Sequence, residues 1–143
     1  MNDRGFLSIQ SIFSMFIIII IALGCVFYIE NIVQSTEDNS LNVESRLFLD
    51  KISYEINQVN SNGEGYSKVI DLPDDIGGYS YLIKISSDEV LLEVSNKKGK
   101  TDIFPISLVN HDKLPIKEIK LYTGEKYSIS KLEENKISIE KVV

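Results

Sequence analysis

The chain has 143 residues, enough for one compact domain, and a formal net charge of −6. Residues 30–143 hold 14 of the 15 lysines and arginines and 20 of the 21 acidic residues. An acidic distal part repels phosphate backbones, so we expect no nucleic-acid partner. Cys25 and His111 are the only residues of their kinds, which excludes an internal disulfide and a zinc site built from several cysteines and histidines.

The first predicted element is an apolar helix. Residues 12–29 carry no charge, and eighteen helical residues reach about 27 Å, close to the hydrocarbon thickness of a bilayer. A lone segment in lipid satisfies its backbone hydrogen bonds only as a helix. Tyr28 and Glu30 follow at the end of the run, where an amphipathic ring and the first charge are typical of a membrane interface. We therefore predict a membrane helix.

The residues before this helix resemble the class III signal peptide of type IV pilins and their relatives. A prepilin peptidase cuts that signal after a glycine that follows a basic residue, as Gly5 follows Arg4 here. Phe6 matches the first mature position of the bacterial form, and Ser8 matches the third mature position of the archaeal form. Gln10 stands at the fifth, where both forms have Glu. The resemblance implies cleavage after Gly5 and an assembly contact at Gln10 without its usual charge.

Two alternatives to the cleaved anchor stay open. In one, the leader is never removed and the helix is an ordinary single-pass anchor. In the other, Ala22-Leu23-Gly24-Cys25 resembles a bacterial lipoprotein box, which implies lipidation at Cys25. Such boxes usually have Leu three places before the cysteine and continue into polar residues, whereas this chain has Ala22 and stays apolar to Ile29. Cys25 therefore reads better as a small apolar residue inside a membrane helix.

A polar stretch and an amphipathic helix are predicted next, within residues 30–61. Ser35 and Asp38 have the spacing of a capping pair, so a new helix starts near them or the first helix continues unbroken. Beyond them, apolar residues recur at helical spacing, with Leu49 and Tyr54 off the line. The face consists of Leu41, Phe48, Ile52, Ile56 and Val59. We expect it to pack on a core.

Residues 62–143 are predicted to form an antiparallel sheet or a small sandwich of six or seven strands. A cluster of turn-forming residues at 60–65 ends the helix, and Pro73 ends a first strand. Residues 96–100 are expected to form a turn, and Pro105 favours an edge position for the strand that follows. The other strands are predicted at 79–86, 90–95, 101–108, 117–122, 125–131 and 136–142.

Three polar clusters are candidates for chemistry. They are Asp71 with Asp74 and Asp75, His111 with Asp112, and Lys97 with Lys98 and Lys100. The acidic cluster lacks the spacing of an EF-hand, so a solvated turn is favoured over a calcium site. The histidine pair has no marked nucleophile near it, and the lysines are expected to solvate a hairpin tip. We therefore expect no catalytic residue, no metal and no cofactor.

These patterns predict an α+β protein in which an N-terminal transmembrane and amphipathic helix packs on a C-terminal antiparallel β-sheet. The predicted parts are a leader (1–5), a transmembrane helix (6–29), a polar linker with an amphipathic helix (30–61) and an extracytoplasmic β domain (62–143). Residues 54–85 also resemble a segment of archaeal pilin-like proteins.

The resemblance implies a type IV pilin-like protein of the cell surface, single-pass in the cell membrane, with a structural, adhesion or filament-associated role. Its implied partners are the membrane, a prepilin peptidase and other pilin-like subunits. We expect it not to be an enzyme. The alternative is an uncleaved single-pass protein whose outer β domain binds a ligand or partner.

Overall fold

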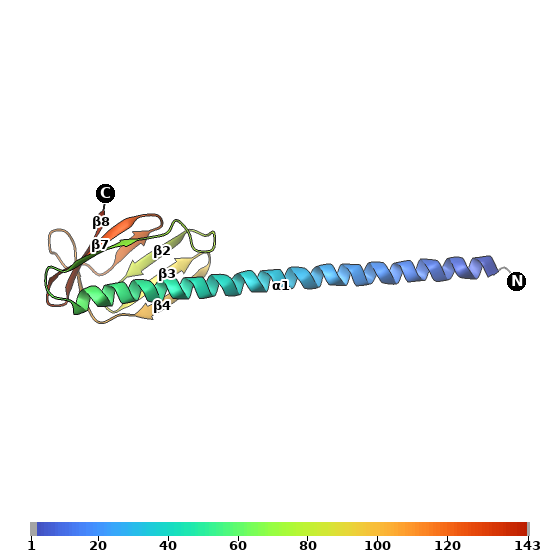
Figure 1. The fold of residues 1–143 in the computed structure, drawn as a ribbon, viewed down its shortest axis with the longest axis horizontal. Coiled ribbons are helices and arrows are strands. Elements are labelled where there is room, and N and C mark those ends of the chain that lie inside the picture. The colour runs from blue at the N-terminus through green and yellow to red at the C-terminus, as the bar shows by residue number, and fades with distance from the viewer. Residues whose placement is uncertain (1–2, 143) are drawn as a thin grey trace. The chain divides into compact units, whose positions relative to one another are not determined.

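The computed structural model describes the backbone of residues 3–142, together with the side chains of these residues except 3–8, 34, 35, 37 and 38. The chain divides into two compact units, residues 1–39 and 40–143. One helix, α1 (Asp3–Ser61), contributes to both units, and the strands all belong to the second (Figure 1).

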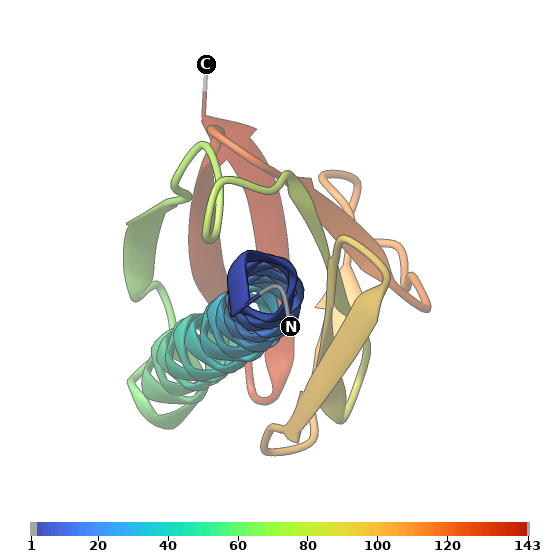
Figure 2. The same ribbon diagram turned by 90° about the vertical axis from the view of Figure 1, so that its right-hand side faces the viewer.

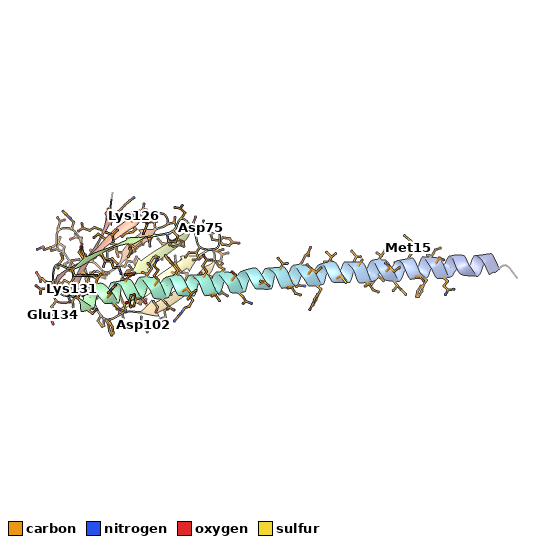
Figure 3. All side chains as sticks on the ribbon, viewed as in Figure 1. Met15, Asp75, Asp102, Lys126, Lys131 and Glu134 are labelled. Atoms are coloured by element: carbon orange, nitrogen blue, oxygen red, sulfur yellow. The ribbon has the colours of Figure 1, made fainter. Side chains whose placement is uncertain are left out.

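The first unit is helical along its described length. Its residues Ile9–Val33 form a helix long and apolar enough to cross a membrane, and none of that span is buried by the rest of the protein. Side chains project from both sides of the helix in the view of Figure 3, for example near Met15. Five consecutive isoleucines favour a strand in water, so the helical state fits an environment in which the segment satisfies its own hydrogen bonds.

Of the two alternatives for residues 31–40, the unbroken helix is confirmed. No proline or glycine occurs between Gly24 and Gly63, so nothing in this stretch removes a backbone hydrogen bond or loosens the helix. The side chains of Ser35 and Asp38 lie outside the described residues. The helix ends at Ser61, inside the predicted turn cluster, and Gly65 has a φ of 82°, which glycine adopts at no steric cost.

The second unit adds eight strands to the end of α1. They are β1 (Ser67–Asp71), β2 (Tyr81–Ile85), β3 (Glu89–Val94), β4 (Lys97–Asp102), β5 (Ser107–Val109), β6 (Ile119–Tyr122), β7 (Lys126–Glu133) and β8 (Lys136–Val142). One sheet has the order β1-β7-β8-β5 and the other has the order β4-β3-β2-β6. The sandwich alternative is thus confirmed, and all strand pairs are antiparallel except β5 with β8, which the antiparallel prediction missed.

The prediction was wrong around β4. Residues 97–100, expected in a turn, belong to the strand, and the turn is the preceding Ser95-Asn96 pair, with a φ of 54° at Ser95. The single strand predicted at 101–108 is interrupted: residues 101–102 end β4, residues 107–108 begin β5, and 103–106 form a loop. Ile103 and Ile106 in this loop are both buried and three residues apart, which does not fit the period-two alternation of a strand. Pro105 lies in the loop between β4 and β5.

The core of the second unit lies between α1 and the two sheets. Figure 2 shows the C-terminal part of α1, which belongs to the second unit, along the open side of the sandwich. The expected residues Ile52, Ile56 and Val59 are at most 2% exposed, and Leu49, placed off the apolar face by sequence spacing, is buried as well. Burying each such side chain contributes about 1.5–3 kcal/mol. Tyr54, also off the line, is exposed as expected.

A lysine of β7 caps the C-terminal end of α1. The Lys131 ammonium donates a hydrogen bond of 2.5 Å to the carbonyl of Asn60, in a last turn that has no basic residue of its own (Figure 3). A cation at a helix C-terminus interacts favourably with the unpaired carbonyls there. On the other side, Lys68 of β1 forms an ion pair with Glu55 and donates a 2.7 Å hydrogen bond to Gln58. These contacts attach α1 to the first sheet.

Candidate binding site

The residues expected to direct processing lie at the start of α1. Arg4, Gly5, Phe6 and Ser8 have helical backbones, and their side chains lie outside the described residues. Gln10 is helical and exposed. The assignment of processing to the first four and of assembly to Gln10 stays a prediction.

The acidic cluster forms a turn held by ordinary contacts. Asp71 forms a 3.0 Å ion pair with Lys126, and the Asp75 carboxylate accepts a 2.9 Å hydrogen bond from the backbone N–H of Gly78. All three aspartates are exposed. Across the described residues, no three His, Cys, Asp or Glu side chains are grouped so that they could hold a metal ion.

The structure brings His111 to a partner far away in sequence. His111 Nδ1 lies 3.3 Å from Glu140 Oε1, and the Ser138 hydroxyl donates a 3.0 Å hydrogen bond to the same oxygen. The Glu140 carboxylate therefore contacts both side chains. Neither of these contacts joins the His111 imidazole directly to the Ser138 hydroxyl. The serine–histidine hydrogen bond of a nucleophilic pair is therefore not among these contacts. Asp112, the expected loop neighbour, is exposed.

A recess that the sequence did not predict lies between α1 and β4. It has a volume of about 130 Å³. Leu49 of α1 and Leu92 and Val94 of β3 give it apolar walls, and all three are at most 2% exposed. Its other lining residues are Asn42, Ser45, Arg46, Lys97, Lys98 and Gly99. We call this feature the α1–β4 recess.

Every charged side chain that lines the α1–β4 recess is basic, in a protein with a net charge of −6. Arg46 Nε is 3.3 Å from Asp50 on the next turn of α1. Lys98 is 3.0 Å from Glu93, and the hydrogen bonds that Lys84 and Lys98 donate to this carboxylate hold its pKa below its usual value. The acids that pair with Arg46 and Lys98, namely Asp50 and Glu93, do not line the recess themselves.

Gly99 keeps the recess open. It lies in β4 opposite the buried Leu92 and lacks the positive φ that would require glycine. A Cβ at this position would meet only a methyl carbon of Leu49, at 3.6 Å, which is ordinary contact. Glycine inside a strand is unfavourable by about 0.5–1 kcal/mol relative to alanine. Since neither the backbone nor the packing calls for glycine, its effect is to leave space beside the strand.

Comparison of the chain with protein-family models, with curated proteins and with solved structures finds no match. The structure is that of an α+β protein in which a long N-terminal apolar helix is followed by two β-sheets. This order is consistent with pilin-like architecture. Because one fold can host many functions, the features that bear on function are the apolar span, the residues that precede it and the α1–β4 recess.

Proposed function

We propose that this chain is a membrane-anchored, pilin-like surface protein with a structural, adhesion or filament-associated role. The observation that carries the proposal is the span Ile9–Val33, 25 residues of apolar helix with no part buried by the protein itself. Apolar surface of this extent is stable in lipid or against other apolar helices, and it is a liability in water. Residues 40–143 form the domain on the outer side of the membrane.

The residues before the apolar span support a proteolytic processing step in this proposal. A basic residue, a glycine and a phenylalanine at positions 4–6 precede the apolar span, the order in which a prepilin peptidase reads its substrate. Cleavage after Gly5 would remove a short segment and leave the whole span in the membrane.

In this proposal, Gln10 makes the contact between neighbouring subunits weaker than a carboxylate would. In filament-forming relatives, a carboxylate at this place is thought to pair with the new terminal amine of a neighbouring subunit. A neutral amide makes a hydrogen bond of about 1 kcal/mol net, against roughly twice that for a charge-assisted bond, and it is less costly to hold unpaired in lipid. We therefore assign this chain to minor or non-polymerising subunits. Purified surface filaments in which this chain is the dominant protein would contradict that assignment.

Mass spectrometry of the mature N-terminus tests the processing step. We expect the protein to begin at Phe6; a start at Met1 would favour the uncleaved anchor, and a lipid-modified Cys25 would favour the lipoprotein. Gly5→Val should accumulate the full-length chain, because a β-branched side chain crowds the scissile bond. Gly24→Val is the matched control, since a Cβ there meets nothing within 4 Å. Equal processing of both variants would refute the proposed cleavage.

The second candidate is the uncleaved single-pass protein whose outer domain binds a partner. The α1–β4 recess favours this candidate, because it offers apolar walls with basic residues beside them on the second unit. Binding at the recess is compatible with either state of the leader. A mature protein that starts at Met1 and binds through the recess would establish the second candidate over the first.

A further inference from the structure

β4 is an edge strand of the second sheet. The strand order β4-β3-β2-β6 places β4 at the end of its sheet, with residues 97–102 paired to residues 89–94 of β3. Within the described part of the chain, the backbone hydrogen bonds of residues 98–102 link them to β3 and to no other segment. An edge strand offers a row of free N–H and C=O groups on which another extended chain can form a ladder.

The side chains of β4 alternate between two surroundings. Gly99 and Thr101 lie opposite the buried Leu92 and Val90, on the face toward the core. Lys98 and Lys100 alternate with these residues. Their side chains are 69% and 67% exposed and form ion pairs with Glu93 at 3.0 Å and with Glu89 at 3.5 Å. Successive residues of a strand placed beside β4 would share these surroundings in turn. One set would lie next to the α1–β4 recess and the other next to the lysines.

We propose that β4 and the α1–β4 recess bind an extended segment of a partner protein in which acidic and apolar residues alternate, and that this segment joins the sheet beside β4. An apolar side chain of the segment fills the recess. Its volume of about 130 Å³ suits one leucine or phenylalanine side chain, since a cavity of about 150 Å³ holds a benzene molecule. Acidic residues on either side lie next to Lys98 and Lys100. This inference does not depend on the membrane proposal.

The same lysines argue against a second copy of this chain as the occupant. Two β4 strands side by side would place Lys98 and Lys100 near the same residues of the other copy, and like charges that face each other across strands are destabilising. Lysines on an edge strand protect proteins from self-pairing in this way. An acidic segment beside β4 would replace this repulsion by attraction. Pairing of β4 with such a segment is therefore favoured over pairing of β4 with a second β4.

Peptide binding to the full-length chain in detergent micelles tests the proposal. The probe is a fluorescent heptapeptide with the sequence Glu-Val-Glu-Leu-Glu-Val-Glu, acetylated and amidated, and the readout is fluorescence anisotropy. We expect saturable binding. One control peptide has lysine at every glutamate, and another has serine at the leucine and both valines. Each should bind at least about tenfold more weakly. Equal binding of the serine peptide would overturn the role of the recess.

Two sets of variants separate the recess from the charge. Gly99→Val should weaken binding at least about tenfold while the melting temperature stays equal or rises, because valine favours strands and fills the space. Lys98→Glu with Lys100→Glu should reverse the preference toward the lysine peptide. Lys113→Glu with Lys117→Glu is the matched control, with the same change in net charge at exposed loop positions. Reversal by this control pair would show bulk electrostatics and refute the site.

Hydrogen exchange then tests the added strand itself. Saturating peptide should slow exchange at alternate amides of residues 97–102 by about tenfold or more and leave β6, at the opposite edge, unchanged. Binding without protection in β4 would overturn the added strand. Protection of β4 that grows with protein concentration in the absence of peptide would identify a second copy as the occupant and overturn the stated partner.

Discussion

The two ends of α1 share one backbone conformation and differ completely in what surrounds their apolar side chains. Between Ile9 and Val33 the large apolar residues are exposed, with Ile18 at 65%, whereas Ile56 in the second unit is fully buried. The difference follows from spacing. Residues 41–59 place most of their apolar side chains on one face, which packs into the core with residues of both sheets. Residues 12–29 are apolar around the whole helix, so one protein surface does not cover them.

The largest expected effect separates a covered residue from an exposed one on the same helix. Ile52→Asp should destabilise the second unit by about 3–5 kcal/mol, the cost typical of a buried charge without a partner. Val43→Asp, at an exposed position of the same helix, should change stability by no more than about 0.5 kcal/mol. Urea unfolding of the full-length chain in detergent, followed by near-UV circular dichroism, measures both. Similar effects in the two variants would break the comparison.

A charge in the apolar half should act on insertion and leave the fold unchanged. Ile20→Arg places a charge near the middle of the span, which disfavours insertion by about 2.5–3.5 kcal/mol. We expect a larger fraction of the protein to be released from membranes by alkaline carbonate. Leu47→Arg, exposed on α1 in the second unit, should be retained like the parent chain. Equal release of the two variants would show that the span is not in lipid.

The end of α1 offers a smaller effect. Lys131→Met removes the cation that caps the Asn60 carbonyl and should cost about 1 kcal/mol of stability. Lys126→Met removes an exposed ion pair with Asp71 and should cost a few tenths of that. Thermal unfolding of the two variants gives the comparison. A larger loss in Lys126→Met would mean that the cap does not hold the helix to the sheet.

The last expected effect is a fall in stability at high pH. Burial and a 2.5 Å hydrogen bond to Glu125 raise the pKa of the Tyr127 phenol to about 12, against about 10 in an unfolded chain. Between these values the unfolded state loses its proton first, so stability falls as pH rises from about 10 to about 12. Burial also raises the pKa of Tyr81. Tyr127→Phe should therefore reduce the fall without abolishing it, as measured by denaturant unfolding over this range.

Sequence periodicity predicted the parts of the molecule that depend on local pattern. The buried face with Ile52, Ile56 and Val59 and the end of the helix near residues 60–65 both follow from spacing and turn residues. Leu49 was missed because one face of a helix that lies between two sheets is wider than a single line of residues.

The candidate site depends on contacts that no local pattern carries. Three lysines and a glycine disfavour a strand by propensity, and β4 forms because it continues a ladder with β3. The available signal was the alternation of Lys98 and Lys100 with smaller residues. The recess also needs α1 beside β4, and these elements are about 50 residues apart in the chain. Similarly, nothing near His111 in sequence indicates its contact with Glu140.

The pairing of β1 with β7 sets the order of events during synthesis. Ser67 lies opposite Ser130, and β8 is the strand that pairs with β5, so the first sheet is incomplete until residues 136–142 have left the ribosome. The span Ile9–Val33 emerges about 110 residues earlier, which is about 5–20 s at ordinary elongation rates. The apolar span is therefore available for insertion before the first sheet of the second unit can be completed. The second sheet needs no residue beyond Tyr122, so the two sheets of one unit become available at different times.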